Sequence, residues 1–239
     1  MLKLKDFVDK YKNQPCVIYG AGPSINFIDT KPLEQFISIG VNSGILANKN
    51  IDFFLSDDQG IHHWDYFYNL NCINLLYENK LKKYSNHLNA EKTVFFKHKS
   101  FFSPPNNYNF DGIKLTKEEI LIGSRTSMGT SLNVAYIFGC NPVILIGNDC
   151  KKSKEGYRYF WQYWDKDKQP KRLDYEFNQS NQNKGFDTKA YIEYLNYFSI
   201  YNKEIIEKEF NIIDCSDSDH NIFPKMSLKE ILDKYGEKR

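Results

Sequence analysis

A cluster of small polar residues with one arginine comes directly before a predicted helix in the middle of the chain. Residues 123–127 read Gly-Ser-Arg-Thr-Ser, and apolar side chains recur at helical spacing over residues 128–138. The first turn of a helix has free backbone N–H groups and the positive end of the helix dipole. Arg125, Thr126 and Ser127 therefore predict an anion site suited to a phosphate group. The alternative is a solvated loop arginine beside residues that only cap the helix.

A glycine turn near the N-terminus predicts similar chemistry. Residues 16–19 have the pattern of a short buried strand and run directly into this turn. Glycine lets the backbone approach a ligand closely, and the peptide groups after the proline can open a helical turn that holds a phosphate or a ribose. The alternative is a purely structural turn, because the third glycine of the dinucleotide fingerprint is missing. The nucleotide-binding residues predicted here are Gly20, Ala21, Gly22, Pro23 and Ser24.

Polar residues also follow three other predicted strands, each at the point where the strand ends. These residues are Asn42 after residues 36–41, Asp57 and Asp58 after residues 51–55, and Gly147 and Asp149 after residues 143–146. In an open parallel α/β sheet the ligand crevice lies beyond the carboxyl ends of the strands, so these residues are expected to share one edge. The predicted fold is a Rossmann-like α/β domain, with an open, mostly parallel sheet flanked by helices.

The remaining segments supply the elements that must position these loops. Further strands are predicted at residues 72–77, 93–96 and 212–215, and helices at residues 2–11, 43–49, 62–70 and 188–210, with a capped closing helix after Ser227. Two long segments without periodicity, residues 97–119 and 150–186, are predicted to be loops or lids. No linker divides the chain, so residues 1–239 are expected to form a single domain.

The second of these long segments is dense in aromatic residues, lysine and arginine. We expect it to close on an anionic substrate, with Tyr157 and Tyr159 as hydroxyl donors to a leaving phosphate. Lys151, Lys152 or Arg158 would supply the counter-charge. The competing interpretation is that the aromatic residues at 159–164 form a hydrophobic plug, or a contact between copies of the chain in a homo-oligomer.

Composition limits the classes of partner. The 239 residues contain 32 Lys and Arg against 30 Asp and Glu, a net charge of +2 that gives no sign of a nucleic-acid partner. The five cysteines are scattered without a Cys-x-x-Cys pair, as in a reducing cytoplasmic setting. No signal-peptide pattern and no apolar stretch of about 18 residues occurs. We therefore expect no transmembrane span and a cytoplasmic protein, either free or peripheral at the inner membrane.

Six blocks of the sequence together carry a resemblance to a known family. They are GAGPSI at residues 20–25, Asn42, SDD at 56–58, RTSMGTSLNVAYIFG at 125–139, LIGND at 145–149 and IIDCSDSDHNIFPKMSLKEIL at 212–232. In this order they resemble the family of motility accessory factors and 6-hydroxymethylpterin diphosphokinases (MptE-like proteins), and the related bacterial lipooligosaccharide sialyltransferases. The resemblance implies a Rossmann-like domain that binds a nucleotide or a nucleotide-sugar at the strand ends.

The sialyltransferase branch implies transfer of a sugar from a cytidine monophosphate (CMP) donor to a glycan or other hydroxyl acceptor. By matching position, Arg125, Tyr157 and Tyr159 would stabilise the departing phosphate, and the glycine turn with Asn42 would surround the nucleotide. These enzymes have a general-base histidine after the tyrosines, whereas this chain has no histidine between residues 150 and 213. Either another group removes the acceptor proton or the reaction differs. The candidates are Asp57, Asp58, His62, His63 and His220.

The diphosphokinase branch implies transfer of a diphosphoryl group from ATP to a hydroxymethyl acceptor, with Mg²⁺ to neutralise the phosphate charge. Asp57, Asp58 and Asp149 are the carboxylates that would hold this metal. A third hypothesis is a non-catalytic accessory protein that binds a nucleotide or an activated sugar. The arginine and the tyrosine pair favour the glycosyltransferase, for which we expect a CMP-linked donor, no metal and no tightly bound cofactor.

Overall fold

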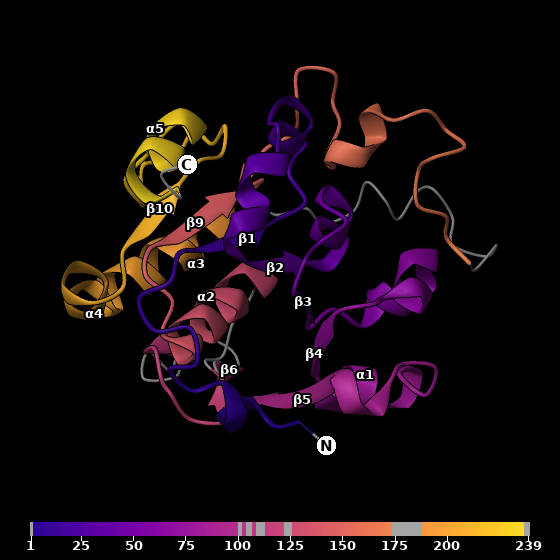
Figure 1. The fold of residues 1–239 in the computed structure, drawn as a ribbon, viewed down its shortest axis with the longest axis horizontal. Coiled ribbons are helices and arrows are strands. Elements are labelled where there is room, and N and C mark those ends of the chain that lie inside the picture. Colours follow the sequence, from indigo (N-terminus) through magenta and orange to yellow (C-terminus); the bar gives the residue numbers. More distant parts are fainter. Residues whose placement is uncertain are drawn as a thin grey trace.

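The computed structural model describes residues 2–99, 102–103, 107–108, 113–121, 126–173 and 188–236. The strands of the main sheet are β1 (Cys16–Tyr19), β2 (Ile37–Val41), β3 (Phe53–Ser56), β4 (Ile73–Tyr77), β5 (Thr93–His98), β8 (Ile120–Leu121), β9 (Val143–Ile146) and β10 (Ile212–Asp214). They lie in the order β10, β9, β1, β2, β3, β4, β5, β8, and every neighbouring pair is parallel (Figure 1). The predicted Rossmann-like α/β fold with an open sheet is confirmed.

The strand order reverses beside β1. From β1 the chain proceeds through β2, β3, β4 and β5 to one side, whereas β9 and β10 lie on the other side. Such a reversal is where open α/β sheets bind their ligands, at the carboxyl ends of the strands. Tyr19 and Ile146 are paired in the register of β1 and β9, so Gly20 and Gly147 follow adjacent strand ends.

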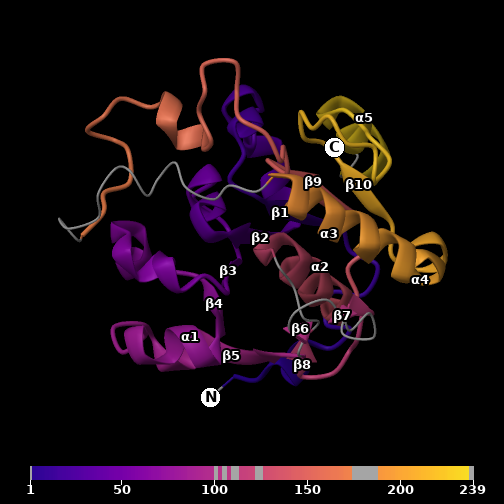
Figure 2. The ribbon, with the colours of Figure 1, turned by 180° about the vertical axis from the view of Figure 1, so that it is seen from behind.

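Alternate side chains of the central strands pack on opposite faces of the sheet. In β1, Cys16 and Ile18 belong to the core on one face and Val17 and Tyr19 to the core on the other, which explains the continuous apolar run. The first face is covered by α2 (Ser127–Phe138) and α3 (Thr188–Tyr201), which Figure 2 shows in front of the sheet. The second is covered by η10 (Phe160–Tyr163) and α5 (Leu228–Tyr235).

The helix α2 begins and ends as the sequence predicts. The Thr126 Oγ1 atom accepts a hydrogen bond of 2.9 Å from the Gly129 N–H group, and Gly139 ends the helix with a positive φ of 76°. The predicted closing helix α5 is also confirmed, with a capping box between Ser227 and Glu230.

Helical structure is present at residues 2–11, 43–49 and 62–70 as predicted, but it consists of short 3₁₀ turns, so the predicted bounds were wrong. The turns are η1 (Leu4–Phe7), η4 (Asn42–Ala47), η5 (Gln59–His63) and η6 (Asp65–Asn69). Trp64 is extended between η5 and η6 because it forms a β-bridge with Arg172, a contact more than 100 residues away in sequence that interrupts the helix. Local periodicity does not contain such long-range contacts.

The helix predicted over residues 188–210 is also wrong, because two helices occupy this stretch. The helix α3 ends at Tyr201, and α4 (Lys203–Lys208) follows. Between them the Asn202 side chain accepts a hydrogen bond of 2.7 Å from the Leu115 N–H group and donates one of 3.0 Å to the Ile113 carbonyl. This buried amide ties the helix pair to the segment before β8.

The segment predicted as a loop or lid over residues 97–119 is partly regular. The strand β5 extends through His98, and β6 (Phe102–Ser103) pairs antiparallel with β7 (Asn107–Tyr108). The remaining described elements are η2 (Pro23–Phe27), η3 (Lys31–Gln35), α1 (Glu78–Leu81), η7 (Lys82–Tyr84) and η8 (Ala90–Lys92). In the part of the chain that the structure describes, no helix has the length and apolar character needed to cross a membrane.

Candidate functional site

A cavity of about 230 Å³ lies where β1 and β9 end. Its floor consists of four short segments that lie far apart in the sequence: residues 20–22, residues 42–43, residues 127–128 at the start of α2, and residues 147–148. Its aromatic wall consists of Trp64, Tyr66, Tyr159, Trp161 and Tyr191. The charged residues Asp58, Lys151 and Arg158 also line the cavity. The predicted convergence of the strand-end loops on one edge is thus present in the structure.

The structure distributes the predicted site residues among several places. The nucleotide-binding candidates that line the cavity are Gly20, Ala21, Gly22, Asn42, Ser127 and Gly147, and Asp58 and Tyr159 line it among the catalytic candidates. Ser24 lines a neighbouring groove of about 640 Å³ beside Asp214 and Glu230. The Tyr157 ring packs edge-on against Tyr163, with 4.8 Å between centroids. Arg125 lies outside the described residues, so its role stays a prediction.

The glycines of the floor are required by protein packing. A Cβ atom on Gly20 would lie 2.4 Å from the Gly147 carbonyl oxygen, and one on Gly22 would lie 2.6 Å from the Asp149 carboxyl carbon. The Gly22 N–H group donates to the Gly147 carbonyl at 2.9 Å, and Gly147 has a positive φ of 67°. The two loops therefore interlock, which is the structural role that the sequence left open for this turn. A ligand contact of these residues stays a prediction.

Asp57 is hydrogen-bonded to the first turn of α2. Its carboxylate accepts hydrogen bonds from the Ser127 hydroxyl and, at 2.8 Å, from the Thr130 hydroxyl, and it lies 3.6 Å from His98 Nε2. Burial alone would raise the pKa of Asp57, but these three partners outweigh it and the pKa lies below its ordinary value. Asp57 is therefore a charged anchor between β3 and the first turn of α2.

Asn42 extends this network to the floor of the cavity. Its Oδ1 accepts a hydrogen bond of 2.8 Å from Ser56, and its Nδ2 donates to the Ser127 hydroxyl at 3.3 Å. The residue has a positive φ of 51°, which asparagine tolerates better than most residues. The ends of β2, β3 and α2 are thus fixed to one another by side-chain hydrogen bonds.

Asp149 likewise connects two segments by hydrogen bonds, here the end of β9 and the turn after β1. Its carboxylate accepts hydrogen bonds from the Ser24 N–H group at 2.7 Å and from the Ser24 hydroxyl at 2.5 Å. Burial raises the pKa of Asp149 to about 6, even though both bonds from Ser24 act to lower it. The Ser24 N–H group, which the sequence offers to a phosphate, is therefore occupied by this carboxylate.

The three carboxylates proposed for Mg²⁺ have separate protein partners. Asp58 Oδ1 accepts a hydrogen bond of 2.9 Å from the Gly60 N–H group, while Asp57 and Asp149 hold the partners described above. Within the described ranges, no group of three His, Cys, Asp or Glu residues is arranged to hold a metal ion. A single carboxylate with substrate phosphates is nevertheless a common Mg²⁺ arrangement, and Asp58 has the position for it.

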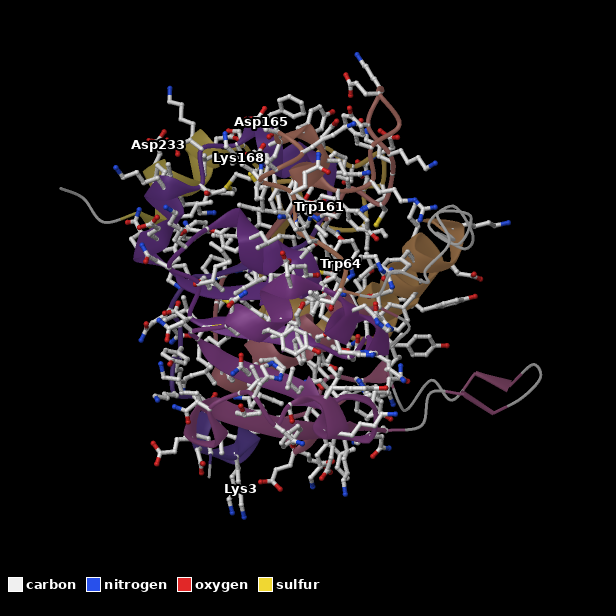
Figure 3. All side chains as sticks on the ribbon, turned by 90° about the vertical axis from the view of Figure 1, so that its right-hand side faces the viewer. Lys3, Trp64, Trp161, Asp165, Lys168 and Asp233 are labelled. Atoms are coloured by element: carbon white, nitrogen blue, oxygen red, sulfur yellow. The ribbon has the colours of Figure 1, made fainter. Side chains whose placement is uncertain are left out.

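The aromatic wall combines rings from three segments: Trp64 and Tyr66 after β3, Tyr159 and Trp161 after β9, and Tyr191 in α3. Tyr159 stacks on Trp161 with 5.1 Å between centroids, and Trp161 meets Trp64 edge-on at 5.6 Å. Figure 3 shows the labelled Trp64 and Trp161 side chains close together. The Phe160 N–H group donates to the Ala21 carbonyl at 3.2 Å, so the segment is anchored to the glycine turn. Phe160 and Trp161 are buried, as the hydrophobic-plug interpretation expects, while Tyr159 lines the cavity.

Hydroxyl and cationic groups of the wall suit an anion. Burial raises the pKa of Tyr159 although the nearby Arg158 charge lowers it, so the phenol is protonated at neutral pH and can donate a hydrogen bond. Arg158 lines the cavity beside it. Lys151 also lines the cavity, and its Nζ atom is 2.7 Å from the Asp219 carboxylate.

Of the general-base candidates, Asp58 lines the cavity. The His62 ring stacks on Tyr84 with 3.7 Å between centroids and also contacts His63 at 3.8 Å. His220 is buried behind the floor, with Nε2 3.3 Å from the Asn148 carbonyl oxygen. Asp58 is thus the base candidate that the structure places in the cavity lining, and the identity of the base stays a prediction.

Sequence reasoning missed several lining residues. Asn148 belongs to the Gly147-Asn148-Asp149 strand end, and the same strand-end argument could have included it. Trp64 and Tyr66 follow the polar end of β3 but were assigned to a helix. Tyr191 has helical apolar spacing that is indistinguishable from core packing, so the sequence carried no signal for its place in the wall.

Comparison of the sequence with known protein families shows to which family the chain belongs. The family model described as "6-hydroxymethylpterin diphosphokinase MptE-like" matches residues 1–155. Comparison with curated proteins and with solved structures yields no match. The matched residues contain all four segments of the floor, and the match ends within the segment that leads to Tyr159 and Trp161 of the aromatic wall. The chain belongs to the MptE-like family, as the ordered blocks of its sequence predict.

Proposed function

We propose that this chain is a nucleotide-dependent transferase that moves a sugar from a CMP-linked donor to a hydroxyl acceptor such as a glycan. The observation that carries the proposal is the cavity at the reversal of strand order, where loops distant in sequence meet. Open α/β sheets bind nucleotides at this position. The donor nucleotide would lie between the floor and the aromatic wall.

The charges of the cavity support glycosyl transfer. The bond from the sugar's anomeric carbon to the CMP phosphate breaks, a bond to the acceptor oxygen forms, and negative charge grows on the departing phosphate. Arg158 and the Tyr159 hydroxyl line the cavity and would stabilise that charge. Asp58 would take the proton of the acceptor hydroxyl.

Arg125 completes the proposal as the phosphate anchor. It directly precedes Thr126, whose side chain caps the helix that delivers Ser127 and Met128 to the floor. Arg125→Ala is expected to weaken CMP binding about tenfold, the loss of one charge-assisted contact of about 1.4 kcal/mol. Calorimetric titration of CMP measures it, with Lys168→Ala, an exposed cation paired with Asp165, as the control. Equal affinity of Arg125→Ala and wild type would reject the role.

The second candidate is a diphosphokinase, which the description of the matching family favours. ATP would then donate a diphosphoryl group to a hydroxymethyl acceptor. Asp58 would hold Mg²⁺ together with phosphate oxygens, and the metal would neutralise phosphate charge. Planar rings of an acceptor or of a nucleobase both suit the aromatic wall.

One experiment separates these candidates. Thermal unfolding is measured with CMP, with ATP, and with ATP plus Mg²⁺ or a chelator, and a ligand at about 100 times its dissociation constant adds about 2.7 kcal/mol of stability. Glycosyl transfer predicts stabilisation by CMP without metal. Stabilisation by ATP that a chelator abolishes would favour the diphosphokinase. No shift with any nucleotide would reject both enzymes, and binding without turnover of CMP-sugars or ATP would favour an accessory protein.

A further inference from the structure

In the part of the chain that the structure describes, two neutral side-chain nitrogen donors of the cavity lining are buried without an acceptor. Asn148 is 4% exposed and Trp161 is 7% exposed, and both residues line the cavity. Among the described residues, Asn148 Nδ2 and Trp161 Nε1 are buried side-chain atoms without a hydrogen-bond partner. Buried donors are almost always paired in proteins, so each of these two requires a specific explanation.

The two side chains are neutral and differ in hydrogen-bonding capacity, because an amide can donate and accept whereas an indole can only donate. An indole N–H can only donate, so Trp161 can be satisfied only by an acceptor atom. The Asn148 amide is held in place by its own backbone: its N–H group donates to the Ser216 hydroxyl at 2.8 Å, and its carbonyl oxygen lies 3.3 Å from His220 Nε2. Its side-chain oxygen contacts the Cys150 thiol at 3.9 Å, which leaves Nδ2 as the free end.

We propose that Trp161 and Asn148 form a base-recognition subsite that donates hydrogen bonds to the acceptor edge of a heteroaromatic nucleobase. This inference rests on the proposed function, because it names the part of the nucleotide that the inner cavity reads. The base meets the edge of the Trp161 ring, because Tyr159 stacks on that ring and the indole N–H group lies in the ring plane. A small rotation of the indole on binding brings this N–H group to a carbonyl oxygen or ring nitrogen of the base.

The kind of donor distinguishes this subsite from the phosphate site. An anion is best held by charged donors, and Arg158 and Lys151 of the lining are such donors. A neutral amide and an indole are the donors that proteins use for neutral acceptors such as ring carbonyls. Asp58 keeps its proposed role as the base for the acceptor hydroxyl. The cavity would thus read the base and the phosphate with different groups.

Nuclear magnetic resonance tests the indole directly. The chain has three tryptophans, so a ¹⁵N-labelled protein gives a separate indole N–H signal for each of Trp64, Trp161 and Trp164, assigned with single Trp→Phe variants. On saturation with whichever of CMP and AMP binds, the Trp161 proton signal is expected to move downfield and its exchange with water to slow. Ribose 5-phosphate, which lacks the base, is expected to leave it in place. A Trp161 signal that does not respond to the nucleotide, or that responds equally to both probes, would overturn the subsite.

Affinity gives the independent test. Trp161→Phe keeps the aromatic face but removes the N–H group, and is expected to weaken nucleotide binding about tenfold while ribose 5-phosphate binds unchanged. Asn148→Ala is expected to act in the same direction. Trp164→Phe, in a ring that packs on Phe160, is the matched control with no expected effect. Wild-type binding to CMP or AMP with unchanged affinity in both variants would reject the subsite alone. Failure of wild type to bind any nucleotide would reject the proposed function itself.

Discussion

The floor and the aromatic wall of the cavity are built by different interactions. The floor is fixed by interlocked glycine turns and by carboxylates that hold hydroxyl and N–H groups, as at Asp57 and Asp149. The wall is held by ring packing: Tyr159 stacks on Trp161, and Trp161 contacts the sequence-distant Trp64 edge-on. Polar networks with short backbone contacts specify one geometry, whereas stacked rings tolerate small rearrangement.

The family match divides the wall. The floor, Trp64 and Tyr66 lie within residues 1–155, whereas Tyr159, Trp161 and Tyr191 lie beyond them. We expect the interlocked floor to fix the geometry of the site and the wall to contact the base or the acceptor. Substitutions in the floor should therefore affect stability first, and substitutions in the wall should affect ligand choice and turnover.

The largest expected loss of stability follows substitution of an interlocked glycine. Gly20→Ala places a methyl group 2.4 Å from the Gly147 carbonyl oxygen, so the backbone must shift, and the free energy of unfolding is expected to fall by about 3 kcal/mol. Urea unfolding followed by circular dichroism measures it. The matched control is Gly60→Ala, whose added methyl group meets only the Asp58 side chain at 3.3 Å and should cost less than about 1 kcal/mol. Equal losses in the two variants would show that the floor is not interlocked.

Asp149 predicts a pH dependence of stability. Because its folded pKa of about 6 lies above the ordinary value of 3.8, the folded state binds the proton more tightly than the unfolded state. Its contribution to stability is present below about pH 4 and is lost as the pH rises through 6, a change of roughly 2 to 3 kcal/mol. Urea unfolding at pH 4 to 7 should therefore show Asp149→Asn gaining stability relative to wild type as the pH rises. A constant difference would contradict the burial of this carboxylate.

Asp57 predicts a pH dependence of stability opposite to that of Asp149. Its folded pKa is lowered, so its contribution is present above the ordinary pKa and is lost as the pH falls through the lower folded value. Asp57→Asn is expected to cost about 2 kcal/mol at pH 7, the loss of hydrogen bonds to a charged acceptor. The same unfolding experiment measures it, with the exposed pair of Asp165 and Lys168 as control, because Asp165→Asn should change nothing measurable. An Asp57→Asn variant as stable as wild type would show that α2 is held by its packing alone.

The smallest expected effect is on turnover, after removal of a hydroxyl group from the aromatic wall. Tyr159→Phe removes a hydroxyl that lines the cavity and is expected to lower kcat about tenfold with KM nearly unchanged, a modest loss because Arg158 shares the developing charge. Tyr157→Phe, in a ring that packs on Tyr163, serves as the matched comparison and should slow turnover less. Steady-state kinetics with a CMP-sugar donor measure both. Slower turnover in Tyr157→Phe than in Tyr159→Phe would reverse the assignment of the two tyrosines.

The sequence predicts the floor better than the wall, for a physical reason. Parallel strands end at one edge, so the positions of Gly20, Asn42 and Gly147 follow from strand patterns alone. The wall depends on contacts between distant segments, such as the β-bridge from Trp64 to Arg172, which no local period contains. The bracing roles of Asp57 and Asp149 were equally hidden, because a carboxylate at a strand end has the same sequence signal whether it binds a metal, a ribose or a neighbouring hydroxyl.

Amide hydrogen exchange with and without nucleotide tests the central claim most directly, because it reports on both sides of the cavity at once. CMP, or ATP with Mg²⁺, is expected to slow exchange in the glycine turn at residues 20–22, at the start of α2, and at residues 157–161 of the wall. Protection confined to the neighbouring groove around Ser227 and Glu230, or protection at neither side of the cavity, would contradict a nucleotide held between the floor and the aromatic wall.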